Sequence, residues 1–74
     1  MKEITNKKEL GKVLSEIKSK QQITYYKVMK ESGLNVTTQK SIENGSTNYT
    51  IDLLLRFCKS IGAKVYIDVD ELVK

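Results

Sequence analysis

Apolar and polar residues follow one another along this chain first with the spacing of helices and then with the spacing of a strand. Between Leu10 and Ile17 the apolar positions fall at i, i+3, i+4 and i+7, and charged residues lie off that stripe, as in an amphipathic helix. Asn6, followed three residues later by Glu9, is close to a capping box and predicts the start of this helix. We expect the helix to end near residues 21–22.

Two short helices are predicted next, chiefly by their end signals. Thr24 suits an N-cap and Gly33 ends the first helix, while Asn35 suits the N-cap of the second and Gly45 can follow it in the left-handed conformation. The second helix has one strong core residue, Ile42. At about 100° per residue, the residues that face away from it are Val36, Thr37, Lys40, Ser41 and Asn44.

A core helix and a strand are predicted in the C-terminal part. Thr50 can cap the helix and Gly62 ends it. The apolar face should hold Ile51, Leu54, Leu55, Cys58 and Ile61, with Leu53 and Phe57 beside it. From Ala63 to Asp70 apolar and polar residues alternate strictly, which predicts a strand. Its apolar side consists of Ala63, Val65, Ile67 and Val69. A lone strand leaves backbone groups unpaired, so we expect pairing with a second copy, and hence a homodimer, through Val65, Ile67 and Val69.

The charge balance favours an acidic partner. The chain has 74 residues, which suffices for one small domain. Residues 1–62 hold 11 basic and 6 acidic side chains, a net charge of +5, whereas residues 63–74 hold 2 and 3, a net charge of −1. The positive charge therefore accompanies the helices, and a polyanion is a more natural partner than a cation.

The scarcity of reactive side chains excludes several classes of function. With one cysteine and no histidine, the chain offers no internal disulfide, no Cys/His set for zinc and no imidazole for proton transfer. No pair of nucleophile and base can be nominated, so we expect neither an enzyme nor a cofactor or metal. No apolar run is long enough for a membrane span or a signal peptide. We therefore expect a cytoplasmic protein with no membrane partner.

The order of these parts resembles the phage-repressor and Cro type helix-turn-helix family, also called the XRE family. The resemblance covers roughly Leu10 to Gly62, and its most specific features are Gly33 at its spacing from Thr24 and the string Ile42-Glu43-Asn44-Gly45. Together with the strand, it predicts a mainly α fold: a four-helix, repressor-like helix-turn-helix DNA-binding domain at residues 1–62, followed by one C-terminal β-strand and tail at residues 63–74 that serve dimerisation.

The resemblance also implies a function and a set of site residues. In such domains the second helix of the motif lies in the major groove of double-stranded DNA, while the first crosses the backbone. This implies a sequence-specific transcriptional regulator, a repressor acting as a homodimer on a palindromic operator. Base contacts are expected from the outward face of the second helix, at Val36, Thr37, Lys40 and Ser41. Phosphate contacts are expected from a helix N-terminus and from the following loop, at Tyr25, Tyr26, Asn44, Ser46 and Asn48. Members of the family often pair the glutamate of the Ile42-Glu43-Asn44-Gly45 string with a basic residue of the first helix, which here implies an ion pair between Lys18 and Glu43.

The chain departs from the family pattern at a few positions. Tyr25 stands where the family usually has glutamine, and Met29 where alanine is common. Gln39 replaces an isoleucine or valine of the recognition helix, which predicts a looser or differently shaped core beneath it. A strand takes the place of the fifth helix that many members have.

A second function stays open beside the regulator. The fold also occurs in modules whose task is to bind a protein, such as an antitoxin that masks a cognate toxin, because fold does not fix function. An antitoxin that represses its own operon would satisfy both hypotheses.

Overall fold

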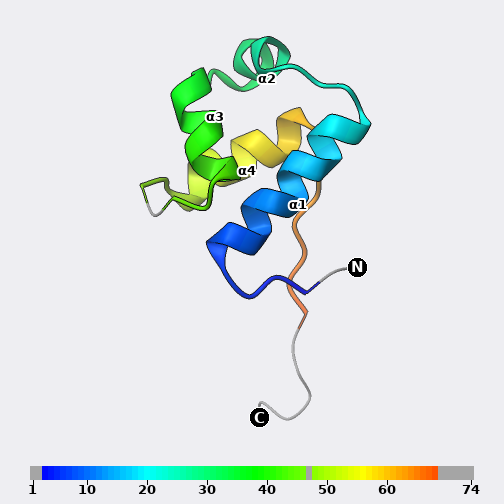
Figure 1. The fold of residues 1–74 in the computed structure, drawn as a ribbon, viewed down its shortest axis with the longest axis vertical. Helices are drawn as coiled ribbons and strands as arrows, with labels where there is room; N and C mark the ends of the chain where they lie inside the picture. The colour runs from blue at the N-terminus through cyan, green and yellow to red at the C-terminus, as the bar shows by residue number, and fades with distance from the viewer. Residues whose placement is uncertain (1–2, 47, 69–74) are drawn as a thin grey trace.

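The computed structural model describes residues 3–46 and 48–68, and the fold of these residues is mainly α. The described part contains four helices (Figure 1): α1 Lys7–Lys20, α2 Tyr25–Ser32, α3 Val36–Glu43 and α4 Ile51–Ser60. Their bounds lie within one or two residues of those expected from the cap signals. None of these helices is both long and apolar enough to span a membrane.

Each helix begins at the predicted N-cap residue. The side chains of Asn6, Thr24, Asn35 and Thr50 all accept a hydrogen bond from the backbone N–H three residues further along. The carboxylate of Glu9 lies 3.5 Å from the hydroxyl of Thr5. These side chains satisfy donors that a helix cannot pair internally, which explains why the starts of the helices are readable from the sequence.

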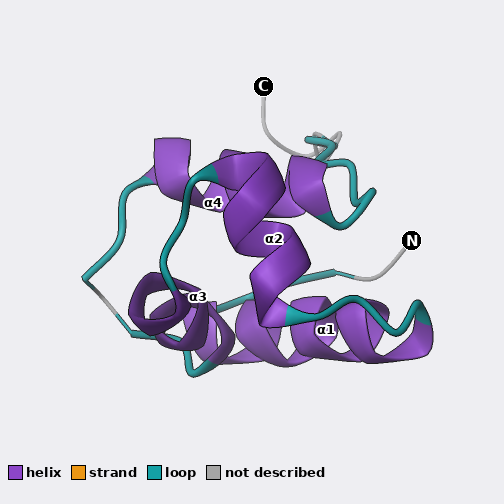
Figure 2. Ribbon diagram, turned by 90° about the horizontal axis from the view of Figure 1, so that it is seen from above, coloured by secondary structure: helices purple, strands orange, loops and turns teal. Residues whose placement is uncertain are grey.

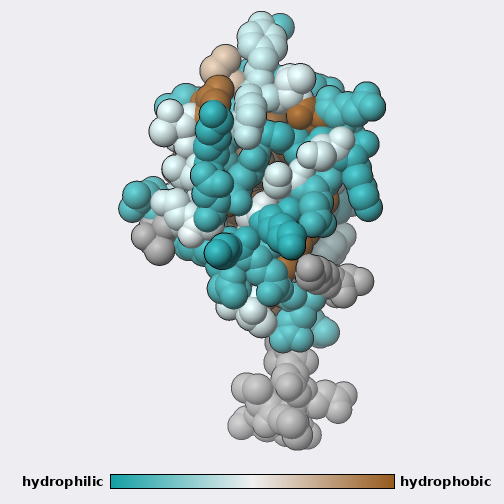
Figure 3. Space-filling model, in the orientation of Figure 1, coloured by the Kyte–Doolittle hydropathy of each residue, from teal (hydrophilic) through white to brown (hydrophobic). Residues whose placement is uncertain are grey.

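The four helices enclose one apolar core. α1 packs against α3, and α2 packs against both α3 and α4, so that α2 crosses between the other elements when seen from above (Figure 2). The core consists of Leu14, Val28, Leu34, Ile42, Tyr49, Leu54, Phe57, Cys58 and Ile61. The face shown in Figure 3 is mostly hydrophilic. The pair α2 and α3 is therefore held from two sides, by α1 and by α4.

The buried face of α4 differs from the predicted one. Phe57 is fully buried, whereas Ile51 is 62% exposed and Leu55 is 45% exposed. At about 100° per residue, Leu54 and Ile61 mark the centre of the buried arc, and Phe57 lies closer to that centre than Leu55 does. The prediction for Ile51 and Leu55 is wrong because the other helices cover a narrower arc of α4 than the width of its apolar stripe.

The predicted C-terminal strand is not seen. Residues 63–68 follow α4 without forming regular secondary structure, and Val69 lies outside the described residues. Figure 1 shows this segment leaving α4 and running past the helices. Val65 and Ile67, predicted to be covered by a second copy, are exposed. A strand requires a neighbour that pairs with its backbone, and the described part of a single chain provides none.

Candidate nucleic-acid interface

The turn between α2 and α3 is fixed by backbone conformation and by α4. Gly33 adopts the left-handed conformation with φ +78°, and its N–H donates to the carbonyl of Met29 at 2.8 Å. This conformation strains any residue with a Cβ. Arg56 of α4 donates to the carbonyl of Ser32 at 2.7 Å, and Leu34 is buried directly after the turn. The angle between α2 and α3 is thus set by Gly33 and held by contacts on both sides of it.

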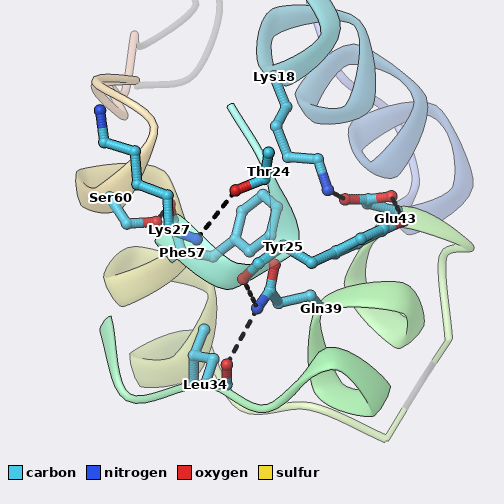
Figure 4. Close-up of polar contacts among 9 residues, drawn as sticks. All are labelled: Lys18, Thr24, Tyr25, Lys27, Leu34, Gln39, Glu43, Phe57 and Ser60. Atoms are coloured by element: carbon cyan, nitrogen blue, oxygen red, sulfur yellow. Dashed lines mark hydrogen bonds and ion pairs between the residues drawn. The ribbon is translucent and has the colours of Figure 1, made fainter. Parts of the chain in front are cut away.

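Gln39 links α3 to α2 from within the core. Its side chain is fully buried, and its Nε2 donates to the carbonyls of Tyr25 and Leu34, both at 3.0 Å (Figure 4). Its Oε1 has no hydrogen-bond partner among the described residues. Of the looser or differently shaped core expected beneath α3, the structure shows the second, because a buried amide with two directional hydrogen bonds takes the place of an apolar side chain.

We expect the substitution Gln39→Leu to lower the stability of the fold. Leucine keeps most of the volume but leaves two carbonyls without their side-chain donor, a change that typically costs about 1–3 kcal/mol for a buried group. Relief of the unpartnered Oε1 offsets part of that cost. Urea unfolding followed by circular dichroism measures the effect, with the exposed Thr37→Ala of the same helix as the control. A Gln39→Leu protein more stable than the wild type would contradict the linking role.

A buried polar cluster of Lys18, Glu43 and Tyr25 joins the first three helices. The Nζ of Lys18 lies 2.7 Å from Oε2 of Glu43, and the two side chains are only 9% and 10% exposed. The hydroxyl of Tyr25 donates to the other oxygen, Oε1, at 2.9 Å, and the ammonium of Lys18 sits 3.2 Å from the centroid of the Tyr25 ring. The predicted pair of Lys18 and Glu43 is therefore present, and Tyr25 completes it (Figure 4).

The cluster changes the chemistry of Tyr25. Burial raises the pKa of its phenol above the usual value, and so do the hydrogen bond to Glu43 and the charge of that carboxylate. The phenol therefore stays protonated, and its single proton is used by Glu43. The predicted phosphate contact by the Tyr25 hydroxyl stays a prediction, and it would require the hydroxyl to give up its hydrogen bond to Glu43, since a phosphate oxygen needs that same proton.

The other predicted phosphate contacts lie at the start of α2 and after the end of α3. Tyr26 is 63% exposed at the start of α2, and Asn44 and Asn48 are exposed after α3. Ser46 is half-buried, and its hydroxyl accepts a hydrogen bond from the N–H of Asn48 at 3.1 Å. In Figure 1 the start of α3 lies near α2 and the loop follows its other end.

The predicted base contacts lie on the outer side of α3. Val36, Thr37 and Lys40 are exposed, and Ser41 is half-buried. Glu43 is the only acid of this helix, and its charge is engaged by Lys18. The outward face thus combines hydroxyls, methyl groups and one ammonium, which are groups that read base edges in the major groove.

The N-termini of α2 and α3 carry no acidic residue in their first turns, whereas α1 has Glu9 and α4 has Asp52 there. An acid in the first turn offsets the partial positive charge of the helix N-terminus. The partial positive charge is therefore offset at the N-termini of α1 and α4. At the N-termini of α2 and α3 it remains available to attract an anion.

Gly11 is a site residue that the sequence pattern does not reveal. A Cβ at this position would contact the carbonyl oxygen of Glu43 and would come within 2.5 Å of the carbonyl oxygen of Ile42. α1 and the end of α3 therefore approach each other closely at Gly11. A lone glycine inside a predicted amphipathic helix is a weak signal for such an approach, and nothing in its spacing identifies the partner.

Comparisons with known proteins add no assignment to this geometry. No protein-family model matches the sequence, and no curated protein is significantly similar to it.

Proposed function

We propose that this protein is a sequence-specific double-stranded DNA-binding regulator that acts as a repressor. The observation that carries the proposal is the solvent-facing side of α3, where Val36, Thr37 and Lys40 project from a helix that is anchored on its other side. α3 has a polar, cationic outer face and follows a tight turn and a second short helix, α2. Helix-turn-helix proteins enter the major groove with this geometry.

Electrostatics also favour DNA binding on the side of the molecule formed by α2 and α3. The two helix N-termini without acids belong to α2 and α3, so a phosphate backbone that meets this side gains from both. The sequence up to residue 62 has a net charge of +5, which favours approach of a polyanion. The mechanism is occupancy of the operator, and it requires no chemical step.

We expect the substitution Lys40→Ala to relax base discrimination. Lysine donates well to O6 and N7 of guanine, and loss of such a contact costs about 1–3 kcal/mol, roughly a five- to 150-fold change in Kd. Fluorescence anisotropy on duplexes selected from a random pool, at two salt concentrations, measures the effect. The preference at one or two base pairs should disappear.

Lys59→Ala is the matched control for this substitution. It removes the same charge from an exposed position in the last turn of α4, so it should weaken all duplexes slightly and leave base preference intact. If Lys40→Ala and Lys59→Ala behave alike, α3 does not read bases. If the wild type shows no preferred duplex and no salt dependence, the proposal fails altogether.

A pairing of two C-terminal segments would complete the regulator. Residues 63–68 have no pairing neighbour in the described part of one chain, and an antiparallel partner strand from a second copy would satisfy their backbone groups. The same pairing would cover Val65 and Ile67, now exposed. Two copies related by a two-fold axis would place their recognition helices about 34 Å apart, on half-sites of a palindrome.

Light scattering tests this pairing. We expect a dimer at micromolar concentration, and we expect removal of residues 63–74 to yield a monomer that keeps its helical circular dichroism. The double substitution Ile51→Ser and Leu55→Ser changes the exposed apolar residues of α4 and serves as the control, which should stay dimeric. A full-length monomer, or a dimer that survives the deletion, would contradict the pairing.

A protein-binding role is the second candidate, favoured by the exposed Ile51 and Leu55 on α4. These residues lie outside the outward face of α3 and have no task in reading DNA. A protein that binds no DNA specifically but keeps a stable fold would move this role, including that of an antitoxin, to first place.

A further inference from the structure

The aromatic ring of Tyr25 has two lysines near it, and these lysines have different environments. The Nζ of Lys18 is 3.2 Å from the ring centroid, and the Nζ of Lys40 is 5.8 Å from it. Lys18 is buried, while Lys40 is exposed on the outward face of α3. The ring of Tyr25 therefore belongs to the buried polar cluster and also lies near Lys40, a predicted base contact.

The ring is held in place by three residues on two other helices, α1 and α3. The Tyr25 hydroxyl donates to Glu43 at 2.9 Å, the backbone carbonyl of Tyr25 accepts from Gln39 at 3.0 Å, and the ammonium of Lys18 covers the ring. The backbone of Tyr25 and the tip of its side chain are thus both hydrogen-bonded. A ring fixed in this way can act as a stationary surface for a mobile group beside it.

Lys40 is a side chain that gains from such a surface. A lysine carries its charge on a flexible four-carbon stem, and ordering that stem on binding is costly. The face of an aromatic ring attracts an ammonium within about 6 Å of its centroid. Repulsion between the two ammonium groups near the ring is reduced because Glu43 neutralises Lys18 at 2.7 Å.

We propose that Tyr25 is a positioning residue for Lys40. Its ring restricts the ammonium of Lys40 to the side of α3 that faces the DNA, so that base discrimination by Lys40 depends on an aromatic side chain at position 25. This inference rests on the proposed function. It gives Tyr25, for which a phosphate contact is predicted, a different task. Tyr25 acts through the side chain of Lys40, and its effect is on sequence preference.

A double-mutant cycle on base discrimination tests the proposal. The measured quantity is the ratio of Kd values between the selected duplex and a duplex changed at the base pair that Lys40 reads. Tyr25→Leu should lower this ratio about two- to five-fold in the wild-type background. It should have no effect on the ratio in the Lys40→Ala background. Tyr25→Phe keeps the ring and should keep most of the discrimination.

Tyr26→Leu is the matched control. It removes a neighbouring exposed ring, which has the ammonium of Lys30 5.8 Å from its centroid and makes no cation–π contact with Lys40. We expect it to weaken all duplexes alike and to leave the ratio unchanged. A merely structural role of Tyr25 would produce that same uniform pattern and would overturn the proposal, as would equal losses of discrimination in both backgrounds. If the wild type binds no duplex selectively, it is instead the proposed function that fails.

A measurement on the free protein covers the case in which Tyr25→Leu does not fold. A ring shields protons that lie over its face, so the ε-methylene protons of Lys40 should resonate upfield of those of Lys12, which has no ring contact among the described residues. Carbon–proton correlation spectra of the wild type and of Tyr25→Phe should both show this displacement. Coincident Lys40 and Lys12 shifts in the wild type would overturn the proposal without any DNA.

Discussion

Replacing Glu43 by alanine should cost the fold about 3–5 kcal/mol, the range found when one partner of a buried ion pair is removed. The substitution leaves the ammonium of Lys18, whose side chain is 9% exposed, without its carboxylate in a poorly solvated position. It also removes the acceptor of the Tyr25 hydroxyl. Because marginal domains have total stabilities of about 5–15 kcal/mol, the variant should melt far below the wild type or be partly unfolded at room temperature.

Two further proteins separate the pair from a general effect of charge. Glu16→Ala removes an exposed acid from α1 and should change the melting temperature little. The double variant Lys18→Met and Glu43→Leu removes both charges together and should regain much of the lost stability, since an apolar pair of similar volume often replaces a buried ion pair without loss. Thermal unfolding by circular dichroism gives the comparison. An unchanged melting temperature for Glu43→Ala would show that the pair contributes nothing.

Gly11→Ala should lower stability by about 1–3 kcal/mol, the usual cost of inserting atoms into a packed region. For a domain of this size this corresponds to a fall of roughly 4–8 °C in melting temperature per kcal/mol. The added methyl group meets backbone atoms of Ile42 and Glu43, which cannot rotate away as a side chain could. α1 and the end of α3 must therefore move apart at this point.

The sign of this effect distinguishes tertiary contact from helix propensity. Alanine is favoured over glycine in a helix interior by about 1 kcal/mol, so propensity alone predicts that Gly11→Ala stabilises the protein. Ser19→Ala, at an exposed position of the same helix, should follow propensity and be neutral or slightly stabilising. A Gly11→Ala protein with a raised melting temperature would show that α1 and α3 are not in close contact at this point.

The bounds of the helices could be predicted because their signals are local. Thr24, Asn35 and Thr50 each pair with a backbone N–H three residues away, and this contact depends on nothing beyond one helical turn. Gly33 likewise ends α2 by its own conformation. The ion pair of Lys18 and Glu43 could be anticipated only through resemblance to a family, because 25 residues separate its partners.

Features that depend on packing escaped the sequence pattern. The polar Gln39 predicts a looser or differently shaped core, but nothing in the sequence shows that two backbone carbonyls lie within reach of its amide. Leu55 is apolar and exposed because the other helices cover only part of α4. The strand expected from Ala63 onward depends on a neighbour, and alternation of residue types shows only that a strand would have two unlike faces.

The anchoring of α3 by its inward residues affects how its outer surface can change. Ile42, Gln39 and Glu43 hold the helix from within, while Val36 and Thr37 are exposed. Exposed substitutions away from such anchors usually alter stability by less than about 0.5 kcal/mol. Residues at positions 36 and 37 can therefore be exchanged in combination while the backbone beneath them stays in place. A library of variants at these two positions would explore new binding preferences on an unchanged framework, without compensating mutations elsewhere in the chain.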